Sequence, residues 1–340
     1  MPDPTDHHVP GPVEIDWQRV QVLAEVVSGL PRADDFAARV MRPVAASDED
    51  CFRAFLFAAS ICHSTHGGLG GSRNGGDFNG WDYLVEAFAA WAERDPGGLD
   101  LSRMSALNQA GLENLLRLPF DTSRVTLTDL ERRAAILVDV SDAIEDRYAG
   151  EVVRLLQACD NRVGGVGGAY GLLRALPGFM DPLEKKSSAF LMAVHFSGRW
   201  PIHDQENVRP MIDYHRMRLL LRTGCIVPLS SDLASQLRSR ETVQLADGAA
   251  IRAAAMEICS AIPSMTGMAV FDFDVLLWAL ARSCCRNRPL CVDEGPESLS
   301  FYEYTGLPES VGCVLTRVCP GAMSVTTRSY WEPELETEDY

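Results

Sequence analysis

The chain lacks any hydrophobic run long enough to cross a bilayer. A spanning helix needs about 20 mostly apolar residues, and the most apolar stretch, 268–281, is interrupted by Asp272 and Asp274. The N-terminus is acidic and proline-rich, unlike a secretory signal. Glycine-rich segments at 67–80 and 164–168 lack the Gly-Lys-Ser/Thr sequence of a phosphate-binding P-loop. We therefore predict a cytoplasmic protein that does not associate with membranes.

Alternating polar and apolar residues, which would indicate strands, are also lacking. Most periodic segments instead carry apolar residues three and four positions apart, the spacing of an amphipathic helix. Thr128-Asp129-Leu130-Glu131 predicts a capping box at the start of a long helix that reaches Tyr148. The predicted fold is all-α, with further helices at 17–28, 36–41, 49–62, 81–91, 152–158, 183–196, 213–222, 232–238, 249–262 and 273–282.

Charge is distributed unevenly along the chain. The 340 residues are 46% hydrophobic and 23% charged, which is typical of a globular protein with one large or two modest domains. The net charge of −16 argues against nucleic acid as a ligand, but residues 161–225 hold nine basic and five acidic residues, which leaves −20 on the rest. A basic segment on an acidic protein is what a local DNA footprint requires.

The same segment contains the most informative motif. Asp213, His215, Arg218, Arg222 and Gly224 form the pattern Asp-x-His-x-x-Arg-x-x-x-Arg-x-Gly, downstream of a Leu-Pro-Gly turn. Over roughly residues 165–225 this pairing resembles the helix-hairpin-helix superfamily of DNA glycosylases. The resemblance implies two helical lobes that flank a cleft. It also implies an enzyme that flips a modified base out of double-stranded DNA and excises it, leaving an abasic site.

The hairpin is predicted to bind a DNA phosphate. A Leu-Pro-Gly turn at 176–178 ends one helix, and Asp181 and Glu184 fit the N-cap and capping-box positions of the next. Free backbone N–H groups at such a turn can hold a phosphate without reading sequence. We expect Gly178 and Met180 to make these contacts. Taken alone, the turn also fits a plain connection between two helices.

Two lysines follow the hairpin. In the bifunctional branch of the family, a lysine in this place attacks the sugar C1′ and forms a Schiff base, which requires a neutral amine. Lys186, which is followed by small residues, fits that lysine best, and the adjacent Lys185 would crowd it with positive charge. The intervals to Gly178 and Asp213 exceed those of common bacterial members and are comparable to those of archaeal 8-oxoguanine glycosylases. Solvated lysines that contact phosphate are the alternative, so lyase activity stays open.

Asp213 is the catalytic residue that the resemblance implies. Cleavage passes through a sugar with oxocarbenium character, which a carboxylate beside C1′ stabilises. Asp213 also fits an ordinary N-cap on an arginine-rich helix. His215, Arg218 and Arg222 are expected to face the DNA backbone or to support the structure.

A base pocket is predicted at the first glycine-rich segment. We interpret that segment as a flexible loop, with His66, Asn79, Trp81 and Asp82 close by. A flexible connector is the alternative. Aromatic residues that could stack on a flipped base are Trp81, Tyr83 and Trp200, although such residues also fill cores. The default substrate is an oxidised or alkylated base. A bulky phage-type modified base, with a role in antiviral defence, would also suit a glycine-lined loop.

The ten cysteines are better explained as reduced thiols or metal ligands than as disulfides. Four of them match the first and last intervals of Cys-x6-Cys-x2-Cys-x5-Cys, the set that holds a four-iron four-sulfur cluster in endonuclease III-like glycosylases; these are Cys284, Cys291, Cys313 and Cys319. The middle interval is longer here, and Cys285 makes the ligand choice ambiguous. Four thiolates would hold zinc equally well, and unliganded cysteines are the third interpretation. Base excision itself needs no cofactor.

The domain organisation expected from these elements has four parts. Residues 1–15 form a disordered N-terminus, 50–195 a lobe with the hairpin, 16–49 plus 196–328 a second lobe with Asp213, and 329–340 an acidic disordered tail. We expect a monomer.

Two alternative functions remain. Asp213-Tyr214 also fits the Asp-Tyr pair of queuosine salvage proteins, which release a modified base from a free nucleotide and which the −16 charge favours. A non-catalytic DNA-binding module is the third hypothesis, and it predicts that Asp213→Asn leaves every activity unchanged.

Overall fold

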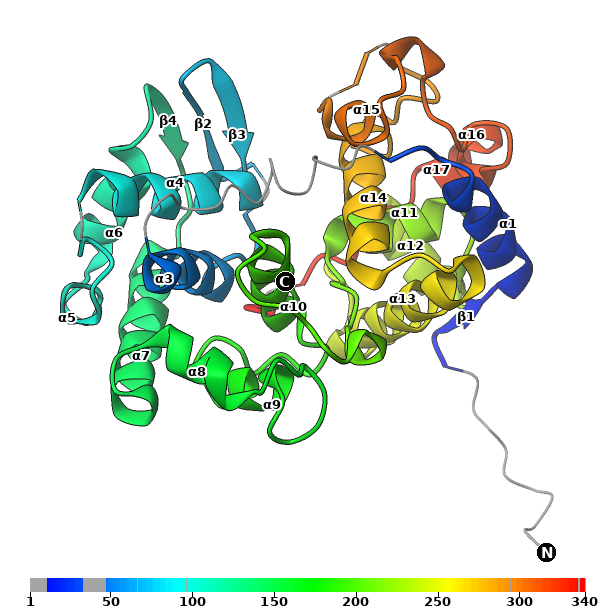
Figure 1. Ribbon diagram of the computed structural model, residues 1–340. Coiled ribbons are helices and arrows are strands. Elements are labelled where there is room, and N and C mark those ends of the chain that lie inside the picture. The colour runs from blue at the N-terminus through cyan, green and yellow to red at the C-terminus, as the bar shows by residue number, and fades with distance from the viewer. Residues whose placement is uncertain are drawn as a thin grey trace, which may run out of the picture. The chain divides into compact units, whose positions relative to one another are not determined.

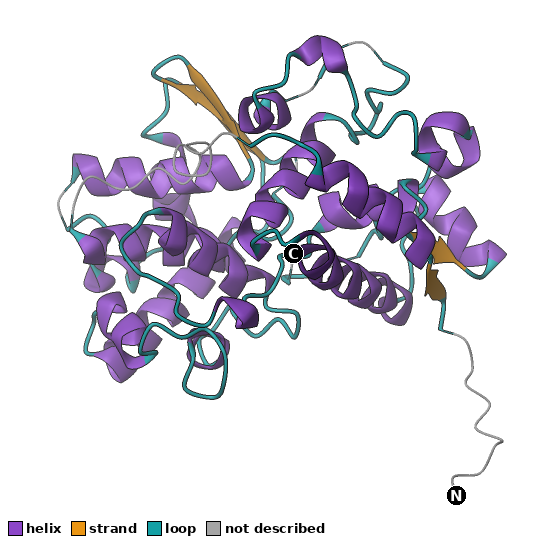
Figure 2. Ribbon diagram, turned by 45° about the vertical axis from the view of Figure 1, so that its right-hand side comes forward, coloured by secondary structure: helices purple, strands orange, loops and turns teal. Residues whose placement is uncertain are grey.

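The computed structural model describes residues 11–32, 47–65, 67–95, 97–293, 295–296, 298–335 and 337–339. Helices dominate and the strands are short (Figure 2), so the prediction of an all-α fold is confirmed. The chain forms two compact units. One spans Met1–Ala33 and Ile212–Glu336, and the other spans Asp34–Met211 and Thr337–Tyr340. We call them the Asp213 unit and the hairpin unit.

The hairpin unit is built around one buried helix, α3 (Asp48–Ser60). Ser47 caps its N-terminus by accepting from the Asp50 N–H, and three acidic residues in its first turn favour the helix dipole. Every residue from Cys51 to Ser60 except Arg53 is buried, because α4, α7, α8 and α10 pack around it. The described elements of this unit after α3 (Figure 1) are β2 (Leu69–Arg73), β3 (Gly76–Asn79), α4 (Trp81–Arg94), α5 (Leu101–Met104), α6 (Gln109–Arg117), β4 (Thr122–Val125), α7 (Leu130–Tyr148), α8 (Val152–Ala158), α9 (Ala169–Arg174), α10 (Lys185–Phe196) and η1 (Gln205–Asn207).

The Asp213 unit packs its helices around α11 (Tyr214–Arg222). This helix contacts α13 (Leu245–Thr266) and α14 (Val270–Ser283), and α1 (Trp17–Ser28) also contacts α13. All residues from His215 to Arg222 are buried, including three arginines. The other described elements are β1 (Val13–Ile15), β5 (Ile226–Pro228), α12 (Ser231–Ser239), α15 (Ser300–Thr305), η2 (Glu309–Val311), α16 (Pro320–Met323) and α17 (Val325–Arg328).

The first glycine-rich segment is a β-hairpin, which corrects the prediction of a flexible loop without strands. Strands β2 and β3 pair antiparallel, and β4 pairs with the other edge of β2 in the order β3-β2-β4. Asn74 and Gly75 connect β2 and β3 with φ values of +52° and +80°, as in the tight turns that Asn-Gly favours. Glycine is required within β2 as well, because a Cβ on Gly71 would lie 2.3 Å from the Thr122 carbonyl oxygen. A second pair, β1 with β5, lies in the Asp213 unit.

The helix at 130–148 is confirmed, but its capping box is not formed. Asp129 occupies the N-cap of α7 without a side-chain capping bond. Its carboxylate is bound instead to His63 and Arg133. The helix predicted at 36–41 lies outside the described residues, whereas 152–158 coincides with α8.

The unit boundaries fall at 33/34 and 211/212 rather than at 49/50 and 195/196. Residues 196–211 belong with the hairpin unit because Asp204 accepts hydrogen bonds from the Val163 and Gly164 amides, at 2.7 and 2.9 Å. Arg209 adds an ion pair to Glu184 at 2.8 Å.

Near both termini, the described residues make defined contacts, contrary to the predicted disorder. Val13 to Ile15 pair with β5. In the predicted acidic tail, Trp331 and Glu332 are buried, and Glu334 bridges to Thr242. The composition of the tail is acidic, but buried arginines of the Asp213 unit supply the partners that hold it.

Among the described residues, no single helix is both long and apolar enough to span a membrane. Helices α13 and α14 meet those criteria only as a pair, and the chain bends by 118° between them.

Candidate active site

The hairpin at 176–184 joins α9 to α10 through a turn that requires glycine. Gly178 has φ +77°, and a Cβ there would lie 2.8 Å from Cγ2 of Ile136 and 3.5 Å from the Ser60 carbonyl oxygen. Leu176 and Phe179 on either side are completely buried and anchor the turn. The next side chain, Met180, is 70% exposed. The turn therefore presents its tip to solvent while its base is fixed in the core.

Asp181 caps the turn that precedes α10 rather than the helix itself. Its carboxylate accepts from the N–H groups of Leu183 and Lys185, at 3.0 and 2.8 Å. Glu184 occupies the N-cap with φ +58° and no capping bond. Its buried carboxylate forms ion pairs with Arg174 and Arg209, so the predicted capping box is replaced by a charge cluster beneath the hairpin.

The two lysines after the hairpin are both buried, which excludes the interpretation that they are solvated. Lys185 is 8% exposed, and its ammonium lies 2.8 Å from the carbonyl oxygen and 2.9 Å from the Sγ of Cys62. Lys186 is 1% exposed and donates to the Ser60 carbonyl at 2.7 Å. Arg133, also buried, donates to the Ile61 and His63 carbonyls. Three cations thus converge on the C-terminal end of α3, where the helix dipole favours positive charge.

Burial and crowding lower the pKa of Lys186 to about 8 from its usual 10.5. Desolvation is the largest cause, and the charges of Lys185 and Arg133 act in the same direction. Nearby, burial lowers the pKa of His63 to about 4, so this imidazole is neutral at physiological pH. Burial opposes ionisation of Asp129, but hydrogen bonds from His63 and Arg133 hold its pKa well below the usual range. A neutral His63 therefore adds no further positive charge to the cluster.

The sequence analysis did not find His63, Arg133, Asp129 or Cys62 as parts of this site. The one available signal was the spacing of Asp129 and Arg133, which are four apart and therefore share a face of the helix. The roles of His63 and Cys62 depend on long-range packing against α3.

In the other unit, Asp213 is the N-cap of α11, as its position before the helix predicted. Its Oδ1 accepts from the Arg216 N–H at 3.0 Å, and its Oδ2 lies 3.1 Å from the Arg216 guanidinium. That guanidinium also binds Asp274, at 3.1 Å. Arg216 and Asp274 are completely buried, whereas Asp213 is 8% exposed. The Arg216 guanidinium is thus shared by the Asp213 and Asp274 carboxylates.

His215, Arg218 and Arg222 do not face solvent, which corrects their assignment to DNA phosphate. Arg218 pairs with Glu332 at 2.7 Å and with the His215 ring at 2.9 Å. Arg222 donates to the carbonyls of Tyr330 and Arg286. The guanidinium groups of Arg218 and Arg222 lie 4.6 and 5.4 Å from the centre of the Trp331 ring. These residues hold the C-terminal segment on α11.

The residues predicted for a base pocket are only partly described. His66 lies outside the described residues. Asn79 is exposed at the end of β3, and Trp81 and Asp82 begin α4 half-buried. Two predicted stacking residues are buried, and this corrects their assignment. Tyr83 stacks on Phe120 with ring centres 4.0 Å apart and donates to the Leu116 carbonyl, while Trp200 is 6% exposed.

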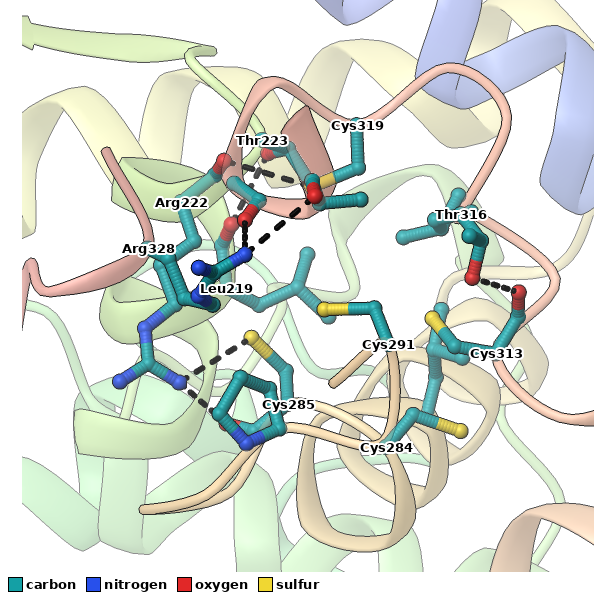
Figure 3. Close-up of a pocket in the computed structure, with 15 residues that line it drawn as sticks. Leu219, Arg222, Thr223, Cys284, Cys285, Cys291, Cys313, Thr316, Cys319 and Arg328 are labelled. Carbon is teal, nitrogen blue, oxygen red and sulfur yellow. Dashed lines mark hydrogen bonds between the residues drawn. The ribbon is translucent and has the colours of Figure 1, made fainter. Parts of the chain in front are cut away.

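The C-terminal cysteines line one cavity in the Asp213 unit (Figure 3). The four predicted ligands are there together with Cys285, and the lining includes Arg222 and Arg328. Within the described residues, no three His, Cys, Asp or Glu side chains are spaced to hold a metal ion. The four cysteines therefore line one cavity, and the prediction that they bind a metal stays a prediction.

Comparison with known proteins gives little guidance. No family model matches the chain, and no curated protein matches it. Among solved structures, the chain is similar to an 8-oxoguanine DNA glycosylase from Pyrobaculum aerophilum, crystallised with 8-oxoguanosine. The TM-score is 0.44 with 15% identity, over 78% of this chain and 89% of that one. A similarity at this level does not establish a function.

Proposed function

We propose that the protein is a DNA N-glycosylase that removes a modified base from duplex DNA and leaves an abasic site. The observation that carries the proposal is Lys186, which follows the hairpin, is buried, and has a pKa of about 8. A lysine with such a pKa is partly neutral near neutral pH, which is the state that a nucleophilic amine needs.

In this proposal the amine of Lys186 attacks C1′ of the damaged nucleotide. The new N–C1′ bond forms as the glycosidic bond breaks, and the bonding electron pair leaves with the base. Loss of the amine protons and opening of the sugar ring then give a Schiff base. To act, the ammonium must release the Ser60 carbonyl, and the neighbouring charges of Lys185 and Arg133 favour its neutral form.

Asp213 supplies the negative charge that the reaction requires. The cleaving sugar acquires positive charge, which a fixed carboxylate stabilises. The bonds from Arg216 orient the Asp213 carboxylate, and Asp274 binds the same guanidinium.

The tip of the hairpin supports DNA as the ligand. Within the part of the chain that the structure describes, the N–H groups of Gly178 and Met180 donate no hydrogen bond. Amides exposed at a turn are suited to a phosphate oxygen.

The test is strand cleavage of end-labelled duplexes that each carry one modified base: 8-oxoguanine, an alkylated purine, or a bulky phage-type cytosine. After alkali, we expect cleavage of one class by the wild type and none by Asp213→Asn. Without alkali, cleavage and borohydride trapping should depend on Lys186 and be lost in Lys186→Gln. Lys185→Gln is the matched control and should keep trapping, because its amine is bound to Cys62, but at a lower rate, because the variant removes a charge that favours the neutral form of Lys186.

Other outcomes would contradict the proposal. Cleavage of no duplex, with release of a base from a free modified nucleotide, would identify a nucleotide hydrolase that uses Asp213 and Tyr214. Tight duplex binding without any base release, unchanged in Asp213→Asn, would identify a DNA-binding module.

A further inference from the structure

The C-terminal residues of the chain contact the helix that carries Arg132 and Arg133. Thr337–Tyr340 belongs to the hairpin unit, as does α7. The carboxylate of Glu338 accepts two hydrogen bonds from Arg132, from Nε at 2.6 Å and from Nη2 at 3.0 Å. Two hydrogen bonds from one guanidinium are the geometry in which arginine binds both carboxylates and phosphates. The contact therefore shows that Arg132 is available to an anion of this shape.

The position of Arg132 in α7 also favours an anion. Arg132 lies in the first turn of the helix, where the helix dipole favours negative charge. Asp129 at the N-cap makes no capping bond to this turn, because its carboxylate is bound to His63 and Arg133. The dipole and the guanidinium therefore attract an anion to the same place, which Glu338 occupies.

Glu338 also lies close to the proposed nucleophile. The hydrogen bonds from Arg132 lower the pKa of Glu338, and the charge of Lys186 acts in the same direction. In return, the carboxylate of Glu338 raises the pKa of Lys186, against the larger effect of burial. While Glu338 is in place it favours the protonated amine, which is not the form that attacks C1′.

A DNA strand and the C-terminal segment compete for this position. A nucleotide whose C1′ reaches Lys186 brings its phosphates into the region where the charge of Glu338 acts, and like charges at short range repel. The side chains of Arg132 and Glu338 are 53% and 45% exposed. An exposed ion pair of this kind contributes little to stability, so Arg132 can exchange the carboxylate for a phosphate.

We propose that Arg132 binds a phosphodiester of duplex DNA beside Lys186, and that Glu338 competes with this phosphate for the same guanidinium. The inference rests on the proposed function, because it takes duplex DNA as the ligand. Glu338 is part of the same chain and is therefore present at a high effective concentration. Its competition lowers the affinity for DNA by the fraction of molecules in which it occupies Arg132.

The experiment measures the Kd of the full chain for a fluorescently labelled duplex by anisotropy, at low ionic strength, where exposed charges are screened least. We expect Glu338→Gln to bind about two- to fivefold more tightly than the wild type, the effect of losing one exposed competing ion pair. Glu151→Gln is the matched control. It removes a carboxylate from the pair with Arg154 in the same unit, whose side chains are 51% and 45% exposed. It therefore measures the gain from losing any one surface carboxylate.

A second measurement distinguishes competition from a structural role of the pair. In an Arg132→Gln background the guanidinium is absent, so Glu338→Gln should add no gain beyond that of Glu151→Gln. The slope of log Kd against log salt should be steeper in Glu338→Gln than in the double variant by about 0.9, the contribution of one phosphate contact. Far-UV circular dichroism checks that each variant is folded.

Three results would overturn the inference. Equal affinities of Glu338→Gln and Glu151→Gln for a duplex that the wild type binds would show that Glu338 does not compete. The full gain from Glu338→Gln in the Arg132→Gln background would show that the phosphate binds elsewhere. Both results leave the proposed function intact. Binding of no duplex by the wild type or any variant would overturn the proposed function as well.

Discussion

Two buried lysines of the hairpin unit and two buried arginines of the Asp213 unit are held in opposite ways. In the hairpin unit, Lys185 and Lys186 donate to backbone carbonyls at the end of α3. In the Asp213 unit, Arg216 and Arg218 are buried to the same degree but bind carboxylates, from Asp274 and Glu332. Carbonyl dipoles solvate an ammonium without cancelling its charge, whereas a carboxylate cancels it. Desolvation therefore lowers the pKa of Lys186, whereas for Arg216 and Arg218 the neighbouring carboxylates outweigh desolvation and raise the pKa.

This difference separates reactive from structural charge. A buried cation that forms an ion pair with a carboxylate is stabilised in its charged form and is therefore unreactive. A lysine crowded by Lys185 and Arg133 is held in a destabilised charged form, which costs folding energy and prepares a neutral amine.

The largest effect is expected from breaking the matched pair. Asp274→Asn should lower the free energy of unfolding by about 3–5 kcal/mol, because it leaves the buried Arg216 with only the edge carboxylate of Asp213. Urea denaturation measures this. The matched control is Glu151→Gln, at an exposed pair with Arg154, which should cost less than about 1 kcal/mol. Equal losses in the two variants would show that burial of the pair does not matter.

The second prediction concerns the unmatched cation. Lys186 has a pKa of about 8 when folded against 10.5 in its usual state, so between these values the unfolded chain binds more protons. Stability must then rise with pH across that window, by up to about 3 kcal/mol from this group. Below pH 8 this contribution is absent, because both states are protonated there and burial of the charge is unfavourable.

The measurement compares the wild type with Lys186→Met in urea denaturation from pH 7.5 to pH 10.5. The comparison cancels the other titrating groups. A gap between the two proteins that stays constant with pH would mean that Lys186 is protonated throughout, and the proposed nucleophile would lose its basis.

The difference between local and long-range contacts also explains which features could be predicted from the sequence. Local signals were sufficient for the helix at 152–158, for the turn at Gly178 and for Asp213 as a cap. They could not decide between a structural and a phosphate-binding role for Arg218, because its partner Glu332 is distant in the chain. They also missed His63 and Arg133, whose carbonyl contacts require α3 and α7 to be packed together.

The β-hairpin was missed for a different reason. Asn74-Gly75 is a strong turn signal, but the six glycines in residues 67–76 obscured the alternation expected of strands. The small residues are there because β4 and Tyr83 approach Gly71 closely, a packing constraint that periodicity does not detect.

The third prediction tests the matched group at the C-terminus. Glu332→Gln should cost about 2–3 kcal/mol, since it removes the charge that faces the buried Arg218. Glu338→Gln, at the exposed pair with Arg132, should cost less than about 1 kcal/mol. Urea denaturation of both variants shows whether burial of the ion pair or the acidic charge alone determines the loss of stability. A larger loss for Glu338 would contradict the view that buried arginines are what order this segment.

The smallest effect is expected at the turn that positions the lysines. Gly178→Ala should cost about 1–2 kcal/mol, because alanine at φ +77° is strained and its Cβ would lie 2.8 Å from Ile136. Gly165→Ala is the control, since Gly165 has φ +79° and an added Cβ there meets nothing within 4 Å. Because both positions have a positive φ, the additional loss of unfolding free energy in Gly178→Ala measures the packing cost alone. The Ser60 carbonyl, which binds Lys186, is the next atom in contact, so displacement of the turn should also disturb the lysine. Borohydride trapping should then fall in Gly178→Ala and stay unchanged in Gly165→Ala. If both variants trap equally, the turn does not position Lys186.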